Sequence, residues 1–86
     1  TNTAALAQIL NKDYTSASAT LGAVARPDAL TSYLKAIVAA RTNQDAAVVS
    51  NLKDAIAKDS SFKQRAAQDL EFVSLFNDSA FQALVR

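Results

Sequence analysis

Two segments of the chain share one pattern, and this internal match constrains the fold more than any other feature. NKDYTSASATLGAV (residues 11–24) and TNQDAAVVSNLKDAI (residues 42–56) each follow a short apolar helical stretch and run from a polar turn into a predicted helix. Small or branched residues recur on one face of each predicted helix: Ala17, Leu21 and Val24 in the first, and Val48, Leu52 and Ala55 in the second. Repeats at a period of roughly 34 residues are typical of stacked helix-turn-helix units, which usually bind other molecules without catalysing reactions.

The composition favours an all-α fold in a single domain. The chain has 86 residues, and a domain of this size buries about 60 to 68% of its unfolded surface, which leaves no room for a deep internal active site. It contains one Gly and one Pro, and 50% of its residues are hydrophobic. Because so few residues interrupt a helix and many alanines favour one, we expect helices throughout.

The charge and the residue types also exclude several classes of function. A formal net charge of +1 shows no bias towards nucleic acid or anionic lipid, and no apolar run of about 18 residues predicts a direct membrane span. Without Cys there are no disulfides or thiolate metal sites, and the compartment is not indicated. The chain has no Met and begins at Thr1, so we expect a mature or excised piece of a longer protein. The first predicted helix, with Leu6, Ile9 and Leu10, would normally have a preceding neighbour, so missing upstream repeats are a possible packing partner.

Polar residues before each apolar stretch predict six helices. Short side-chain oxygens at these positions can accept hydrogen bonds from the free amide groups of a first helical turn. The predicted N-caps are Asn2 or Thr3, Thr15 or Ser16, Asp28, Asp45, Ser60 or Ser61, and Asn77 or Asp78. The third helix, from Leu30 to Val38, is apolar on more than one face, so it is expected at the centre of the domain. The stretch DLEFVSLF is expected to be a turn or a short helix.

All four Phe residues follow Ser60. The last unit of a helical repeat leaves an open apolar face that must be covered. Bulky side chains are suited to this task, so the region from residue 60 onwards is predicted to cover the last helix pair.

At this point the chain resembles the tetratricopeptide repeat family. Residues 11–24 match the family's turn of Gly-Asp-Tyr type, followed by small, large and small positions at Ala17, Leu21 and Val24. The tail DLEFVSLFNDSAFQALV looks like the family's end-of-group segment, with Asp-x-x-Phe followed by a Phe-containing helix. The resemblance covers most of the chain. It implies a right-handed superhelix of two antiparallel helix hairpins (1–26 and 27–59) with a C-terminal helical cap (60–86), whose concave side takes peptides or protein surfaces.

The chain has few of the residue types that enzymes use for catalysis or metal binding. The chain has neither His nor Cys, which removes the usual general base and most covalent mechanisms. Asp69 and Glu71 form the only close carboxylate pair, and residues two apart point to different sides of a helix. Asp13, Asp28 and Asp45 stand before helices, where capping explains them. We therefore expect no enzyme activity, no metal site and no cofactor.

The positive residues do not form a track for nucleic acid. Lys53, Lys58, Lys63 and Arg65 lie around the fourth and fifth predicted helices, and Asp54, Asp59 and Asp69 lie among them. Nucleic-acid affinity needs several unopposed positive charges. A mixed, solvated surface is the better interpretation.

The candidate binding residues are Ser32, Lys35 and Arg41, on or just after the third predicted helix. In the family that the chain resembles, this helix would belong to the inner, concave layer, where a basic side chain can meet a peptide carboxylate. The alternative for Lys35 is that it snorkels outward past its neighbours.

The predicted function is a non-catalytic protein-protein interaction or assembly scaffold module with a protein or peptide partner. The alternative is a structural C-terminal cap of a longer helical solenoid with no ligand of its own. A third class, a regulatory domain of an enzyme, would require active residues outside this chain.

Overall fold

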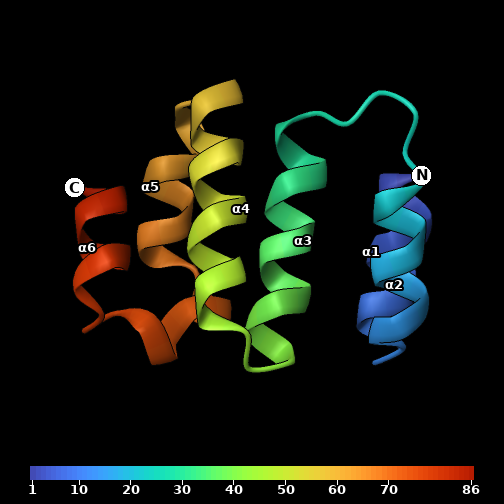
Figure 1. The fold of residues 1–86 in the computed structure, drawn as a ribbon, viewed down its shortest axis with the longest axis horizontal. Helices are drawn as coiled ribbons and strands as arrows, with labels where there is room; N and C mark the ends of the chain where they lie inside the picture. Colours follow the sequence, from blue (N-terminus) through green and yellow to red (C-terminus); the bar gives the residue numbers. More distant parts are fainter.

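The computed structural model describes all 86 residues and contains six α-helices, one 3-10 helix and no strand. The elements are α1 (Asn2–Leu10), α2 (Tyr14–Gly22), α3 (Ala29–Arg41), α4 (Asp45–Lys58), α5 (Ser61–Gln68), the 3-10 helix η1 (Leu70–Leu75) and α6 (Ser79–Val85). Successive α-helices run in opposite directions, so the chain passes back and forth from one end of the molecule to the other (Figure 1). The all-α prediction is confirmed. No helix has both the length and the apolar character needed to cross a bilayer.

The turns of the two helix pairs, α1 with α2 and α3 with α4, have the same backbone geometry. Lys12 has φ 61° and Asn43 has φ 59°, and these two residues alone occupy the left-handed region. The amide of Asp13 donates to the carbonyl of Gln8 (2.9 Å), and the amide of Gln44 donates to that of Ala39 (2.8 Å). Equivalent positions of the two helix pairs, such as Lys12 and Asn43, are 31 residues apart in the sequence. This spacing is shorter than the period of roughly 34 residues expected for stacked helical units.

The matched apolar positions form the core of both pairs. Ala17 and Leu21 are buried in α2, and their equivalents Val48 and Leu52 are buried in α4. Ala55 is also buried, whereas its equivalent Val24 is only half-buried. The core pattern read from the sequence therefore holds at most of its positions.

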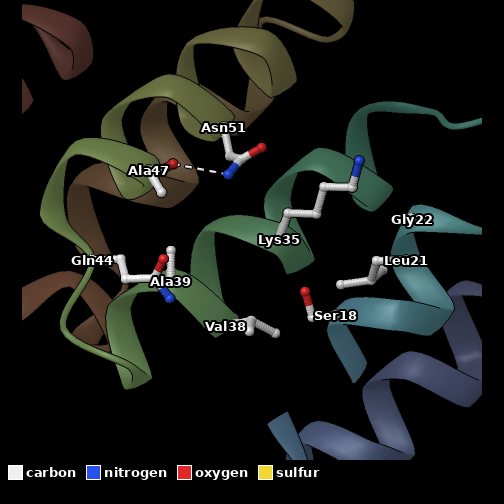
Figure 2. A pocket seen from close by; sticks show the side chains of 9 residues that line it. All are labelled: Ser18, Leu21, Gly22, Lys35, Val38, Ala39, Gln44, Ala47 and Asn51. Carbon is white, nitrogen blue, oxygen red and sulfur yellow. Dashed lines mark hydrogen bonds between the residues drawn. The ribbon is translucent and has the colours of Figure 1, made fainter. Parts of the chain in front are cut away.

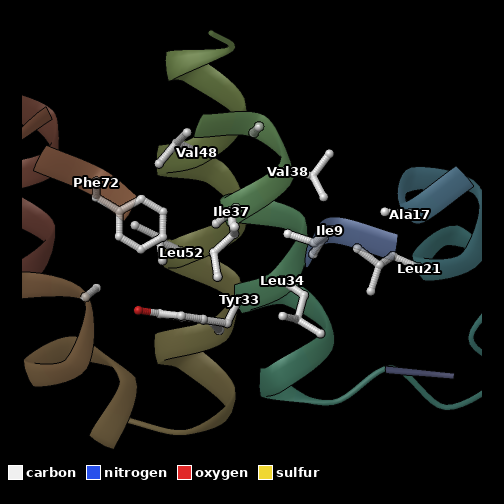
Figure 3. Packing of buried hydrophobic residues seen from close by; sticks show 14 of the residues in the cluster. Ile9, Ala17, Leu21, Tyr33, Leu34, Ile37, Val38, Val48, Leu52 and Phe72 are labelled. Atoms are coloured by element: carbon white, nitrogen blue, oxygen red, sulfur yellow. The ribbon is translucent and has the colours of Figure 1, made fainter. Parts of the chain in front are cut away.

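Helix α3 lies at the centre of the domain, as its sequence predicts. Nine of its 13 residues are buried, and none is exposed. Leu34 and Val38 point towards Ile9 and Leu21 of the first pair, whereas Tyr33 points towards the side of Phe72 (Figure 3). Only a narrow strip of α3 therefore reaches solvent.

The C-terminal segment packs its aromatic side chains against the second pair. Phe72 and Phe81 are fully buried, whereas Phe62 and Phe76 are partly buried. The ring centroids of Tyr33 and Phe72 are 5.6 Å apart in an edge-to-face arrangement, and those of Phe72 and Phe81 are 6.2 Å apart. Helices α5 and α6 contact α4, and η1 contacts α3. The segment DLEFVSLF, expected to be a turn or a short helix, contains the 3-10 helix.

Some predicted helix caps are confirmed and others are wrong by one or two residues. Asp28 caps α3 in a reciprocal capping box with Thr31, and Asp78 caps α6. The cap of α2 is Asp13 instead of Thr15 or Ser16, because the left-handed residue Lys12 closes the turn within three residues. Two further N-cap positions are shifted by one residue, to Thr1 for α1 and to Gln44 for α4.

Candidate binding groove

A groove lined by polar and apolar residues lies between the two helix pairs. Its walls come from α2 and α4, and its floor comes from α3 (Figure 2). It encloses about 300 Å³. The lining residues are Ser18, Leu21, Gly22, Lys35, Val38, Ala39, Gln44, Ala47 and Asn51. A second hollow shares Ser18, Val38 and Gln44 with it and extends the groove to Tyr14 and Thr42.

The groove combines an apolar floor with polar walls. Val38 and Ala39 supply aliphatic surface from α3. The side-chain amide of Asn51 donates to the carbonyl of Ala47 (2.9 Å), and that of Gln44 donates to the Thr42 hydroxyl (2.7 Å). These bonds use the amide nitrogens and leave the amide oxygens of Asn51 and Gln44 as acceptors on the groove wall. A few polar groups around an apolar floor are typical of binding sites.

Lys35 is the only charged residue that lines the groove. The ion pairs of the protein are Arg41 with Glu71 and Lys58 with Asp54, so the Lys35 ammonium is unpaired. Its side chain extends along the groove between Asn51 and Gly22 (Figure 2). The half-buried aliphatic stem lies against α3 and its neighbours while the charge stays accessible.

Asp54 is close enough to Lys35 for the lysine charge to lower its pKa, and its carboxylate already has other partners. Its carboxylate accepts a hydrogen bond from the Ser32 hydroxyl and lies 3.1 Å from the Lys58 ammonium. The Ser32 hydrogen bond contributes most to lowering the pKa of Asp54, followed by Lys58, and the Lys35 charge lowers it further. Of the two lysines near Asp54, only Lys58 is paired with it.

Arg41 is committed to contacts within the fold. Its guanidinium donates to both carboxylate oxygens of Glu71, at 2.9 and 2.6 Å. It also donates to the Tyr14 hydroxyl (3.2 Å) and to the carbonyl of Ile9 (3.4 Å). The hydrogen bond to Glu71, with Tyr14 second, raises the pKa of Arg41 above its ordinary value. Arg41 thus joins the first helix pair to η1 across the end of α3.

The three residues predicted as one binding site do not come together in the groove. With 3.6 residues per turn, Ser32 and Arg41 are about 180° apart around α3. Ser32 is buried against α4, where it bonds Asp54, and Arg41 is held by Glu71. Only Lys35 faces the groove. Four further lining residues were not predicted from the sequence: Ser18, Gly22, Gln44 and Asn51. The only sequence signal for any of them is that Gly22 is the single glycine of the chain.

A separate polar cluster lies where α3 packs against the C-terminal segment. The Tyr33 hydroxyl donates to the Asp69 carboxylate, and the Arg65 guanidinium carbon lies 4.7 Å from the centre of the Tyr33 ring. Burial, and then the hydrogen bond to Asp69, raise the pKa of Tyr33. No group of three or more acidic, His or Cys side chains gathers where it could hold a metal ion.

Comparison of the chain with models of known protein families, with curated proteins and with solved structures finds no significant match.

Proposed function

We propose that the chain is a non-catalytic protein-interaction or assembly scaffold module that holds a short segment of a partner protein in the groove along α3. This proposal rests on the observation that Lys35 has no ion-pair partner and lines a groove whose other lining residues are uncharged. The lysine charge and the polar walls can orient a bound segment, and the apolar floor adds contact area for it.

The architecture supports the same proposal. The repeated turns and the alternating helix directions are compatible with a tetratricopeptide-like superhelix of two antiparallel hairpins, with α5, η1 and α6 as its C-terminal cap. In this scheme the groove lies between the second helices of the two hairpins, with α3 as its floor, and not in the concave layer of first helices that the resemblance implies. Contacts of a partner are therefore expected to centre on Lys35. Ser32 and Arg41 would contribute only indirectly, by holding the helices around the groove in place through Asp54 and Glu71.

Charge reversal tests this proposal. A peptide selected from a random library on the wild-type chain should lose binding to Lys35→Glu and keep binding to Lys53→Glu, because Lys53 is an exposed lysine of α4 outside the groove. Both substitutions are at accessible positions, so each is expected to change the unfolding free energy by no more than about 0.5 kcal/mol. Binding that survives Lys35→Glu and is lost in Lys53→Glu would move the interaction to the outer face of α4.

The second candidate function, a structural cap of a longer helical solenoid, is favoured by the outer face of α1. Leu6 is 44% exposed and Leu10 is 71% exposed, and α1 has no charged residue. The positions 31 residues later are Ile37, which is buried, and Arg41, which reaches into the first pair. The face of α1 that carries Leu6 and Leu10 is therefore apolar and uncovered.

Duplication distinguishes this second candidate from the first. A chain with an extra copy of residues 1–31 ahead of Thr1 presents a third helix pair at the same spacing. If α1 receives such a pair, the melting temperature should rise and Leu6→Asp should remove the gain, because the substitution charges the contact face. An added copy that leaves the melting temperature unchanged would argue against the capping role.

A further inference from the structure

We propose that the groove recognises an extended, acidic peptide segment of about four residues, with one Asp or Glu side chain paired to Lys35 and with Gly22 keeping the adjoining space open. This inference rests on the proposed function and names the chemistry of its ligand.

The length of the groove sets the length of the segment. The wall formed by α2 extends from Tyr14 to Gly22 through the two joined hollows. Eight helical steps of 1.5 Å give about 12 Å. An extended chain advances about 3.3 to 3.6 Å per residue, so about four residues occupy this distance.

The hydrogen-bonding groups on the walls favour an extended ligand. A helix satisfies its own backbone groups, whereas an extended segment needs partners for its amides and carbonyls. The amide oxygens of Asn51 and Gln44 are acceptors for backbone amides, and the Ser18 hydroxyl can donate or accept. These groups come from both walls, so they can fix the segment between α2 and α4.

The charge selects an acidic side chain within the segment. Lys35 is the sole lining charge, so a neutral or basic ligand would leave it unpaired or repelled. Capture of a terminal carboxylate uses several converging backbone amides, and the groove residues of α2, α3 and α4 use theirs within the helices. The carboxylate is therefore assigned to an Asp or Glu side chain.

The backbone conformation at position 22 does not require a glycine. Gly22 lies at the last position of α2 without a positive φ, and a Cβ added there would meet no atom within 4 Å. Alanine is the better helix former. A glycine that the fold does not require leaves open space at the edge of the groove, and we assign this space to the ligand.

The test is an amide-shift titration of the full chain with two tetrapeptides, acetyl-Ala-Val-Glu-Ala-amide and its Gln counterpart. The Glu peptide is expected to bind about two- to fivefold more tightly, which is the range of a partly exposed ion pair. This preference should vanish in Lys35→Met and shrink in strong salt, because salt screens accessible charges. Gly22→Ala should weaken binding of both peptides while raising the melting temperature, a combination that a purely structural role of Gly22 would not produce.

The possible results distinguish a failure of the acidic specificity from a failure of the proposed binding function. Equal binding of both peptides with shifts at Ser18, Lys35 and Asn51 would overturn the acidic specificity and leave the groove as a binding site. Shifts confined to other surfaces, or no shifts at millimolar peptide, would overturn both. Unchanged affinity in Gly22→Ala would overturn the role given to Gly22.

Discussion

The first helix pair, α1 with α2, and the second, α3 with α4, share a turn but differ in their surroundings. The first pair packs against α3 and leaves Leu6 and Leu10 exposed. The second pair is covered by the first pair on one side and by α5, η1 and α6 on the other (Figure 1). The same type of turn thus joins one pair with a free apolar face and one pair whose helix α3 has no exposed residue. The groove lies at their junction, and it takes one wall from each pair.

The largest expected effect comes from removing the aromatic cover of the second pair. Phe72→Ala deletes a fully buried side chain that contacts Tyr33, and it should lower the free energy of unfolding by about 3 to 5 kcal/mol. Chemical denaturation measures this loss. The control is Leu10→Ala, which is expected to cost no more than about 0.5 kcal/mol because Leu10 is exposed. A loss below roughly 1 kcal/mol for Phe72→Ala would mean that the C-terminal segment does not stabilise the second pair.

The next effect concerns the link between the first pair and η1. Arg41→Met removes the bidentate bond to Glu71 and the bonds to Tyr14 and Ile9. It should cost about 1 to 2 kcal/mol, because the pair is partly buried and charge-assisted while solvent still screens it. A double-mutant cycle with Glu71→Gln should give a coupling above about 0.5 kcal/mol. Additive effects of the two substitutions would show that the pair contributes nothing specific.

A smaller, stabilising effect is expected at the edge of the groove. Gly22→Ala should raise the free energy of unfolding by about 0.5 kcal/mol, because alanine loses less backbone entropy on forming a helix and meets no neighbouring atom. Thermal denaturation of the unliganded chain measures it. The matched control is Ala23→Gly at the adjacent exposed position, which should destabilise. A loss of stability in Gly22→Ala would show that the fold itself requires this glycine.

The smallest effect in the physiological range is that of pH. Hydrogen bonds from Thr31, Ser32 and Ser61 lower the pKa values of Asp28, Asp54 and Asp59, respectively, below the ordinary value of 3.8. A carboxyl group whose pKa is lower in the folded than in the unfolded state stabilises the fold fully at pH values above its unfolded-state pKa. This stabilisation is lost as the pH falls through its folded-state pKa. The chain has no His, so the melting temperature should be nearly flat between about pH 5 and 8 and fall below about pH 4. A maximum of stability below pH 4 would contradict these assignments.

The sequence predicted the helices and most of the buried positions because both follow from local rules. Leu21 and Leu52 recur at matched places on amphipathic helices, and Asp28 and Asp78 have the short acceptor side chains that cap a helix. The central position of α3 followed from its apolar residues on several faces. Cap errors at α2 and α4 arose because the turn geometry depends on which residue adopts a positive φ.

The binding residues were less predictable because their availability depends on partners far away in the chain. Ser32 finds Asp54, which is 22 residues away, and Arg41 finds Glu71, which is 30 residues away. Neither partner is indicated by the sequence around α3. Lys35 remains a candidate because no such partner reaches it. The walls of the groove, including Ser18 and Asn51, depend on how the two pairs pack together.

The most direct test of the account is a set of intermolecular nuclear Overhauser effects between the isotope-labelled chain and the Glu tetrapeptide. The account predicts contacts from the peptide to both walls and the floor of the groove, at Ser18, Asn51 and Val38, with the Glu side chain nearest Lys35. Contacts at Leu6 and Leu10 of α1, or only along the outer faces of α4 and α5, would contradict a binding site formed between the two helix pairs.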